Sequence, residues 1–218
     1  MLPNDFHRQV AGIVLGVGAR HGFALAGGNA LIAHGLVDRS TEDVDLFSDD
    51  PHAVSAAAAD VEGALRAAGF GVERVDRYGD LADVWEGLED GLAEWTVTSP
   101  SGEVTELQLA HVSRSRRPVV MEVGPVLDIE DVLGGKVAAF AGRAEIRDIV
   151  DVAAALEHYG VQDLIGFAQR LDPGLTGEDY ADAGRRVDHL DDMVFAEFGL
   201  TAPQITALRE RMSVWPRD

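Results

Sequence analysis

The sequence of 218 residues contains no cysteine. This absence excludes a disulfide framework, a zinc site built on thiolates and a cysteine nucleophile. The seven histidines do not replace such a zinc site, because they form no His-x-x-x-His pair and no His-Glu-x-x-His helix. Any catalytic metal is therefore expected to be a hard cation held by carboxylates.

Long apolar runs are also missing, and the opening residues do not resemble a signal peptide. No apolar run approaches the roughly 18 residues that a membrane-spanning helix needs. The opening residues Met-Leu-Pro-Asn-Asp have neither the basic nor the apolar region of a signal peptide. We therefore expect a cytoplasmic protein without a membrane partner.

Positive charge is scarce. The sequence has 38 Asp and Glu against 18 Lys and Arg, which gives a formal net charge of -20. This charge opposes general adhesion to nucleic acid, so a nucleic-acid partner would need a local basic surface or a second protein. One dense basic cluster could hold a tRNA or nucleotide phosphate, or could be a solvated loop: Arg114, Arg116 and Arg117.

The first half of the sequence predicts a mixture of helices and strands. With 46% hydrophobic residues, the chain can bury a substantial core. Asn4 is expected to cap the first helix and Asp50 the third, which Gly69 should end. The expected elements are a helix at 4–20, a strand at 23–27, a helix at 28–33, a strand at 43–47, a helix at 50–68, and strands at 72–77, 94–98 and 104–110.

The second half turns helical. Glycines and prolines divide it into expected helices at 129–143, 146–158, 161–171, 178–195 and 202–212. The fold class is therefore expected to be α+β. We place an α/β domain at residues 1–125 and a helical region, packed on it, at residues 126–218.

Two aspartates are prominent on the strand at 43–47. Asp43 and Asp45 are two residues apart, so a strand places both carboxylates on one face and Val44 on the other. Such a pair can hold divalent ions for nucleotidyl transfer, in which one Mg²⁺ activates the attacking hydroxyl and another neutralises the triphosphate. The alternative is a solvated strand face in an acidic protein.

Gly27 and Gly28 join the preceding strand to the next helix. Small residues at such a junction let backbone N–H groups approach a phosphate, and the helix N-terminus adds a partial positive charge. The alternative is a tight turn that binds no ligand. The turn and the aspartate pair together are more informative than either feature alone.

The spacing of these features resembles a known signature. The sequence Leu25-Ala26-Gly27-Gly28-Asn29-Ala30, followed by Asp43-Val44-Asp45-Leu46, resembles the Gly-Gly-Ser/Thr and Asp-x-Asp motifs of the polymerase-β nucleotidyltransferases. A narrower resemblance, to the AbiEii/AbiGii toxin-type nucleotidyltransferases, rests on the run Arg39-Ser40-Thr41-Glu42-Asp43-Val44-Asp45 and on Lys136, Arg143, Arg147, Asp148 and Asp151.

The resemblance implies a polymerase-β-type fold with a mixed sheet, a Mg²⁺ site at Asp43 and Asp45, and an NTP substrate. It implies that Lys136 contacts a nucleotide phosphate, which suits a flexible ammonium group. It further implies a toxin–antitoxin system with a cognate antitoxin protein, and makes tRNA a candidate acceptor. The residues implied to hold the triphosphate are Gly27, Gly28 and Asn29.

The downstream charged residues leave alternatives open. Lys136 could be a solvated lysine, and Arg143, Arg147 and Asp151 could form a ladder of surface ion pairs, because they are spaced i, i+4. If their helix faces the active-site cleft, Asp148 or Asp151 could orient Lys136 or an arginine, or accept a proton from the acceptor hydroxyl. We therefore count Lys136, Asp148 and Asp151 as candidate catalytic residues and Arg143 as a candidate nucleotide contact.

Two positions depart from the family pattern. Asn29 replaces the usual Ser or Thr, although its amide can still donate to a phosphate. Gln108 takes the position of the usual third metal carboxylate, and Glu106 lies on the same strand face. Either Glu106 binds the metal through a register shift, or the site uses two acids and a neutral ligand. Thr41 could bind phosphate or metal-bound water, or could only shape the turn.

Three functions are compatible with this pattern. The first is Mg²⁺-dependent transfer of a nucleoside monophosphate from an NTP to an acceptor hydroxyl, with tRNA as the acceptor that the resemblance favours. The second is modification of a small cationic molecule such as an aminoglycoside, for which an acidic surface is an advantage. The third is a catalytically degenerate module that only binds nucleotides or a partner, as a missing third carboxylate would favour.

Overall fold

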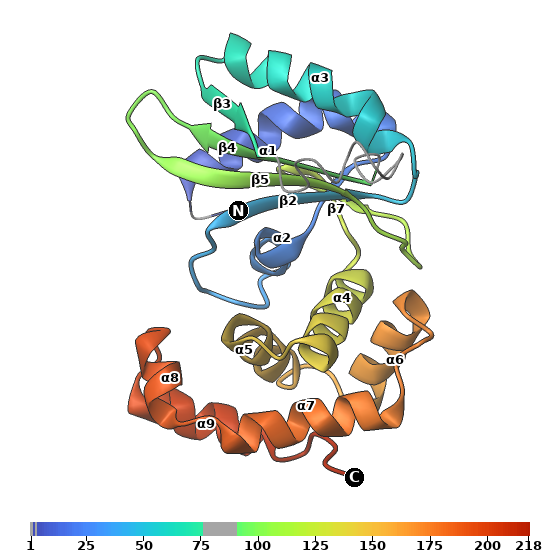
Figure 1. The fold of residues 1–218 in the computed structure, drawn as a ribbon, viewed down its shortest axis with the longest axis vertical. Coiled ribbons are helices and arrows are strands. Elements are labelled where there is room, and N and C mark those ends of the chain that lie inside the picture. Colours follow the sequence, from blue (N-terminus) through green and yellow to red (C-terminus); the bar gives the residue numbers. More distant parts are fainter. Residues whose placement is uncertain (1, 3, 76–90) are drawn as a thin grey trace. The chain divides into compact units, whose positions relative to one another are not determined.

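The structure of this chain is a computed structural model that describes residues 2, 4–75 and 91–218. The chain forms two compact units, Met1–Ile129 and Glu130–Asp218 (Figure 1). The first contains a mixed sheet with helices and the second is helical, so the fold class is α+β. The sequence predicted a boundary four residues earlier, after residue 125. Within the described residues, every helix is too short or too polar to cross a membrane.

A seven-stranded sheet forms the centre of the first unit. Its strands are β1 (Ala24–Leu25), β2 (Asp43–Ser48), β3 (Gly71–Arg74), β4 (Leu92–Thr98), β5 (Val104–His111), β6 (Val119–Met121) and β7 (Gly124–Val126). They lie in the order β3-β4-β5-β2-β1-β7-β6. β2 is parallel to β5, and β3, β4 and β5 form antiparallel pairs, so the sheet is mixed.

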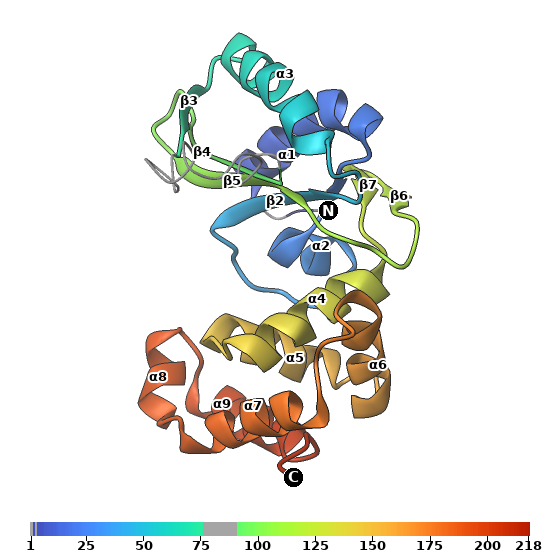
Figure 2. The same ribbon diagram turned by 45° about the vertical axis from the view of Figure 1, so that its right-hand side comes forward.

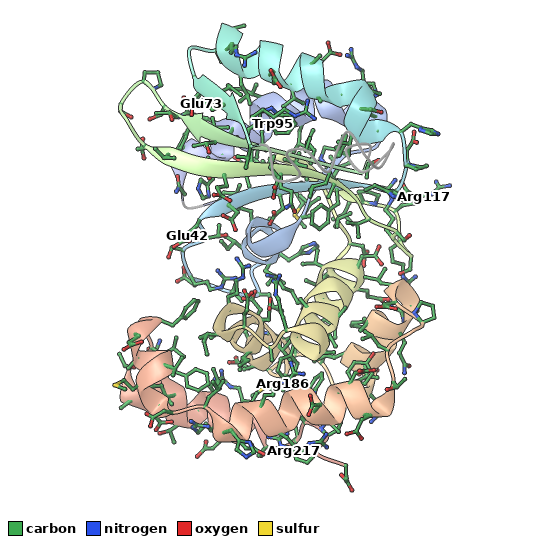
Figure 3. The ribbon with its side chains drawn as sticks, in the orientation of Figure 1. Glu42, Glu73, Trp95, Arg117, Arg186 and Arg217 are labelled. Carbon is green, nitrogen blue, oxygen red and sulfur yellow. The ribbon has the colours of Figure 1, made fainter. Side chains whose placement is uncertain are left out.

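Helices cover both faces of this sheet. α1 (Asp5–Gly18) and α3 (Ala53–Ala67) pack together over one face, and the short α2 (Gly27–Ala33) lies against β2 on the other (Figures 1 and 2). Trp95 of β4 marks the face under α3, because its buried indole Nε1 donates to Glu62 of that helix at 2.9 Å (Figure 3). This hydrogen bond lowers the pKa of Glu62.

The alternation of β2 separates the core from the polar face. Val44 and Leu46 are fully buried, as are Leu107 and Leu109, their partners on β5. The aspartates between them therefore point to the opposite face of the sheet, because successive side chains of a strand alternate. Burial of the aliphatic set makes a one-residue slip of β2 very costly, since the slip would put aspartates into the core.

Local signals explain several boundaries. The predicted cap of α1 is confirmed, because the Asn4 Oδ1 accepts hydrogen bonds from the backbone N–H groups of Phe6 and His7. Gly69 follows α3 with a φ of +91°, as its predicted role as the helix stop requires. The Asp50 prediction is wrong: α3 begins later, at Ala53, and the Asp50 carboxylate instead closes a turn by accepting the His52 N–H at 2.9 Å.

Short strands account for other differences from the sequence prediction. The strand expected at 23–27 is reduced to β1, because Gly27 already belongs to α2. The hairpin of β6 and β7 was not predicted, since three-residue strands carry too little alternation to be recognised. The strand expected at 72–77 corresponds to β3, and residues 76 and 77 lie outside the described residues.

The second unit consists of helices. They are α4 (Ile129–Gly142, which begins at the unit boundary), α5 (Ile146–Ala155), α6 (Val161–Leu171), α7 (Gly177–His189), α8 (Asp192–Glu197) and α9 (Ala202–Met212). The prediction of a single helix at 178–195 is wrong, because the helix is interrupted between α7 and α8. Leu190 is extended there, and Asp191 caps α8 by accepting the Met193 N–H at 2.8 Å.

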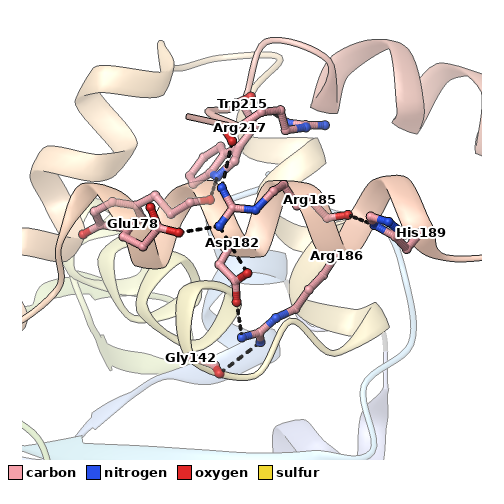
Figure 4. Close-up of polar contacts among 9 residues, drawn as sticks. Gly142, Glu178, Asp182, Arg185, Arg186, His189, Trp215 and Arg217 are labelled. Carbon is pink, nitrogen blue, oxygen red and sulfur yellow. Dashed lines mark hydrogen bonds and ion pairs between the residues drawn. The ribbon is translucent and has the colours of Figure 1, made fainter.

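The residues after α9 pack closely on α7. Trp215 is buried, and its indole donates to the backbone carbonyl of Tyr180 at 3.0 Å. Arg185 of α7 donates to the carbonyl of Arg217 (Figure 4). The Arg217 guanidinium in turn makes two hydrogen bonds to Asp188. The close approach depends on glycine, because a Cβ at Gly184 would lie 2.1 Å from the Pro216 carbonyl oxygen.

We therefore expect Gly184→Ala to lower the free energy of unfolding by about 1–3 kcal/mol, the usual cost of overpacking. The matched control is Gly166→Ala in α6, where an added Cβ meets no atom within 4 Å. That change should stabilise the helix by about 0.5–1 kcal/mol. Urea unfolding of both variants checks the pair, and equal stabilities would contradict the packing observed at Gly184.

Candidate active site

The polar face of β2 carries the two predicted metal ligands. Asp43 and Asp45 are both partly exposed, and they alternate with the buried Val44 and Leu46. The parallel register with β5 places Glu106 beside Asp43 and Gln108 beside Asp45. Paired residues of neighbouring strands point to the same face, so Asp43, Asp45, Glu106 and Gln108 all lie on one side of the sheet.

The turn at Gly27 lies directly against Asp45. Gly27 has a φ of +59°, and a Cβ at this position would lie 1.8 Å from the Asp45 Oδ2. No side chain larger than hydrogen fits there. The backbone reinforces the contact, because the Ala26 N–H donates to the Asp45 carbonyl at 2.8 Å. The structure thus brings the glycine turn and the second aspartate together, as the sequence predicted.

The segment before β2 approaches the other glycine of the turn. A Cβ at Gly28 would lie 2.9 Å from the Thr41 Oγ1 and 3.4 Å from the Arg39 Nη2. Arg39 also donates through its Nη1 to the Ser40 carbonyl at 2.8 Å. Thr41, a predicted phosphate or water contact, is therefore next to the turn. Arg39 was part of the family-like run but had no predicted role, and the structure places it at the same point.

Asn29 is buried beneath this turn rather than exposed on it. Its exposed fraction is 2%, and its Nδ2 donates to the Asp43 backbone carbonyl at 2.7 Å. Its side chain also hydrogen-bonds to His7, a buried residue of α1. Burial lowers the pKa of His7 below 6.5, while Asp43 and this hydrogen bond act in the opposite direction. Asn29 therefore ties α2 to β2, and its contact with phosphate stays a prediction.

The register of β2 and β5 shows where Glu106 and Gln108, the two candidates for the third metal ligand, lie. β2 and β5 pair without a shift, so Glu106 stays beside Asp43 and Gln108 beside Asp45. In residues 2, 4–75 and 91–218, no three His, Asp or Glu side chains are grouped so that they could hold a metal ion. Asp43 and Asp45 nevertheless fit Mg²⁺, which proteins commonly hold through one or two carboxylates while substrate oxygens and water complete the shell.

Sequence analysis overlooked one acid on this face, Glu94 of β4. It is 8% exposed, it pairs with Gln108 across the β4–β5 hairpin, and its Oε1 accepts a hydrogen bond from the Gln108 Nε2 at 2.9 Å. The expected turn at Ser99–Gly102 could not reveal this pair, because counting outward from it pairs residue 94 with residue 107. The observed hairpin closes one residue later, where the Ser99 N–H donates to the Glu103 carbonyl at 2.8 Å, and so pairs residue 94 with residue 108.

The remaining candidate residues form two ion pairs within the second unit. One pair joins α4 to α5, and the other joins α5 to the segment between these two helices. The Lys136 Nζ lies 2.9 Å from the Asp151 Oδ2, and the Arg143 Nε lies 2.8 Å from the Asp148 Oδ2. Both aspartate side chains are fully buried, whereas 15% of Lys136 and 48% of Arg143 are exposed. The predicted pairing of Asp148 or Asp151 with Lys136 or an arginine is therefore present, while the catalytic roles stay predictions.

The alternative of a surface ladder along one helix is wrong. α4 ends at Gly142 and α5 begins at Ile146, so Arg143 does not share a helix with its partner. Asp151 pairs with Lys136, whereas Arg147 pairs with Glu145 at 3.0 Å. The i, i+4 spacing was misleading because the break at Ala144, with a φ of +51°, interrupts the helical repeat.

The basic cluster after β5 is partly a structural feature. Arg114 forms an ion pair with Asp49 and donates through its Nη1 to the Gly22 carbonyl at 3.1 Å. Its side chain is 16% exposed, so it ties this loop to the ends of β1 and β2 rather than offering a solvated cation. Arg116 and Arg117 are exposed.

Comparison with known proteins identifies the family. The sequence model described as "Nucleotidyl transferase AbiEii toxin, Type IV TA system" matches residues 15–173, which is more than half of the chain. The chain belongs to this AbiEii family. It is therefore a nucleotidyltransferase toxin of the type IV toxin–antitoxin class, and membership implies a nucleotide substrate and an antitoxin partner. Among curated proteins, no sequence matches this AbiEii member.

Solved structures share the fold. JHP933 from Helicobacter pylori is 14% identical, with a TM-score of 0.60 over 96% of this chain and 90% of its own. A further H. pylori protein, assigned as a nucleotidyltransferase, is 16% identical, with a TM-score of 0.59 over 96% and 92%. MenT4, a nucleotidyltransferase toxin from Mycobacterium tuberculosis, is 16% identical, with a TM-score of 0.56 over 96% and 82%. At these identities the likeness concerns the fold.

The contact between the glycine turn and Asp45 predicts the effect of Gly27→Ala. The new methyl group would displace the Asp45 carboxylate, so we expect nucleotidyl transfer to fall about 100-fold, as misplacement of reacting groups by about 1 Å often causes. The matched control is Gly35→Ala, since Gly35 has a φ of +74° but an added Cβ there meets no atom within 4 Å. It should lose about 1 kcal/mol of stability and keep its activity.

The buried pair in the second unit predicts a stability effect. We expect Asp151→Ala to lower the free energy of unfolding by about 3–5 kcal/mol, because it leaves the Lys136 ammonium without its buried partner. The double variant Lys136→Met/Asp151→Leu should recover most of this loss. Glu145→Ala removes a half-exposed acid and should cost less than about 1 kcal/mol. Urea unfolding that gives equal losses for Asp151→Ala and Glu145→Ala would contradict the burial.

Proposed function

We propose that this AbiEii protein transfers a nucleoside monophosphate from an NTP to a hydroxyl of tRNA, in a Mg²⁺-dependent reaction centred on Asp43 and Asp45. The observation that carries the proposal is the contact between the Gly27 turn and the Asp45 carboxylate. A turn suited to phosphate and a carboxylate suited to a cation occupy the same point, as binding of a metal–triphosphate complex requires.

The reaction follows from this arrangement. An oxygen of the acceptor hydroxyl attacks the α-phosphorus, the bond between that phosphorus and the α–β bridging oxygen breaks, and pyrophosphate leaves. Bound Mg²⁺ supplies neutralisation of the triphosphate charge and activation of the attacking hydroxyl. Asp43 and Asp45 hold the cation, while backbone N–H groups near Gly27 and Gly28 orient the phosphates.

Residues of the second unit complete the proposal. Lys136 contacts a nucleotide phosphate, and Asp151 fixes the direction of its ammonium group through their 2.9 Å ion pair. Arg143 is a further phosphate contact whose guanidinium Asp148 orients. The proton of the acceptor hydroxyl passes to solvent, because the buried carboxylates of Asp148 and Asp151 are engaged by Arg143 and Lys136.

Net charge is the observation that favours a second candidate function. With a net charge of -20 and an acidic face at Asp43, Asp45, Glu94 and Glu106, the site would attract a small cationic acceptor and repel RNA. An aminoglycoside-like alcohol or amine is the alternative acceptor. The antitoxin or the exposed Arg116 and Arg117 would have to offset this repulsion for tRNA.

The test incubates the full chain with each α-labelled NTP, MgCl₂ and total tRNA, and in parallel with aminoglycosides. We expect label at the RNA 3′ end, abolished by EDTA and restored by added Mg²⁺. Asp43→Ala/Asp45→Ala should reduce transfer by about 1,000-fold or more, because the metal contributes several kcal/mol to the transition state. Glu73→Ala, which removes an exposed acid from β3, is the control and should leave transfer unchanged.

Other outcomes reject the proposal in distinct ways. Label on small amines or alcohols alone would establish the second candidate. Saturable NTP binding without transfer to any acceptor would show a degenerate binding module. Transfer that persists in the double aspartate variant would place the catalytic centre elsewhere in the chain.

A further inference from the structure

Glu94 is buried on the same face of the sheet as the proposed metal ligands. It is 8% exposed, whereas the next residue, Trp95, points through the opposite face to Glu62 of α3. The β4–β5 register pairs Glu94 with Gln108, and the β5–β2 register pairs Gln108 with Asp45. Three neighbouring strands therefore align an acid, an amide and a second acid in one row, with about 4.8 Å between adjacent strands.

The hydrogen bond in this row has a defined polarity. Gln108 donates through its Nε2 to the Glu94 Oε1 at 2.9 Å. A carboxylate can only accept, so the amide nitrogen of Gln108 must face Glu94, and its carbonyl oxygen is the atom left for other partners. The strand on the other side of Gln108 is β2, where Asp45 is its partner. Glu94 thereby selects which amide atom is available on the side of the metal site.

The orientation of the Gln108 amide matters for cation binding. Amide oxygens are good ligands of hard cations, whereas an amide N–H₂ group repels them. The neutral amide of Gln108 also lies between the carboxylates of Glu94 and Asp45. An acid at position 108 would lie directly opposite both of them, and such like-charge pairs destabilise a sheet. Groups that hydrogen-bond to a metal ligand usually fix its orientation, and their removal weakens metal binding.

We propose that Glu94 is a positioning residue of the metal centre, which holds the Gln108 carbonyl oxygen toward Asp45 as the neutral ligand in place of a third carboxylate. The inference rests on the proposed function, because it assumes a divalent cation at Asp43 and Asp45. It adds a residue that lies outside the two aspartates and the glycine turn.

The test measures Mn²⁺ affinity of the full chain, by the electron paramagnetic resonance signal of free Mn²⁺ and by calorimetry. We expect Glu94→Gln to weaken Mn²⁺ binding about ten-fold, because the introduced amide can donate or accept and no longer fixes the orientation of Gln108. Glu73→Gln removes the same charge from the adjacent strand β3 (Figure 3), where Glu73 is exposed and pairs with Thr96 rather than with Gln108. This control should change the affinity less than about two-fold, since the charge it removes is exposed and screened.

The exchange variant Glu94→Gln/Gln108→Glu separates orientation from simple charge loss. It keeps the net charge and reverses the hydrogen bond, since the introduced amide can donate to the introduced carboxylate. It also puts a carboxylate beside Asp45. We expect Mn²⁺ affinity equal to or tighter than that of the natural chain, which a role of Glu94 in packing alone does not predict.

Each result decides the proposal. Equal affinities for Glu94→Gln and Glu73→Gln would overturn it, as would an exchange variant that binds as weakly as Glu94→Gln. If Glu94→Gln fails to fold, the exchange variant, which retains the hydrogen bond, provides the decision alone. Loss of Mn²⁺ binding in Asp43→Ala/Asp45→Ala, with no effect of Glu94→Gln, would reject this inference and leave the proposed function intact. Unchanged Mn²⁺ binding in the double aspartate variant would reject the proposed function itself.

Discussion

The contact between a glycine and a carboxylate organises the first unit of this protein. Asp45 can occupy its place only because Gly27 has no side chain, and Gly27 can adopt its φ of +59° without strain for the same reason. The neighbouring interactions support this contact from several sides: Ala26 bonds to the backbone of Asp45, and Asn29 bonds to that of Asp43. The buried side chains of Val44 and Leu46 fix which face of β2 the aspartates occupy.

The candidate functional aspartates of the two units differ in their exposure to solvent. In the first unit the aspartates of β2 stay partly exposed, so water and ligands can reach them. In the second unit Asp148 and Asp151 are fully buried and depend on Arg143 and Lys136. Buried carboxylates are costly to leave unpaired, so these ion pairs restrict how α4 and α5 can pack as well as where their cations point.

Sequence reasoning recovered the features that depend on short range. The glycine turn, the aspartate pair and the Asn4 cap each depend on neighbours a few residues away, and the structure contains all three. It failed where distant segments decide the outcome. Neither the hydrogen bond between Gln108 and Glu94 nor the burial of Asp148 can be read from local spacing, because each follows from pairing between separate elements. The i, i+4 spacing of Arg143, Arg147 and Asp151 suggested a ladder, although the helices predicted at 129–143 and 146–158 already placed Arg143 and Arg147 on different helices.

The hairpin turn at Ser99–Gly102 has a consequence for how this sequence can vary. Surface turns ordinarily accept insertions, because they bury little and make few contacts. Here the number of residues in the turn sets which side chain of β4 lies opposite Gln108. One added residue that slipped β4 along β5 would exchange Glu94 with Trp95, moving an indole to the polar face and a carboxylate under α3. The length of this outlying loop therefore determines whether Glu94 or Trp95 lies beside Gln108 on the polar face of the sheet.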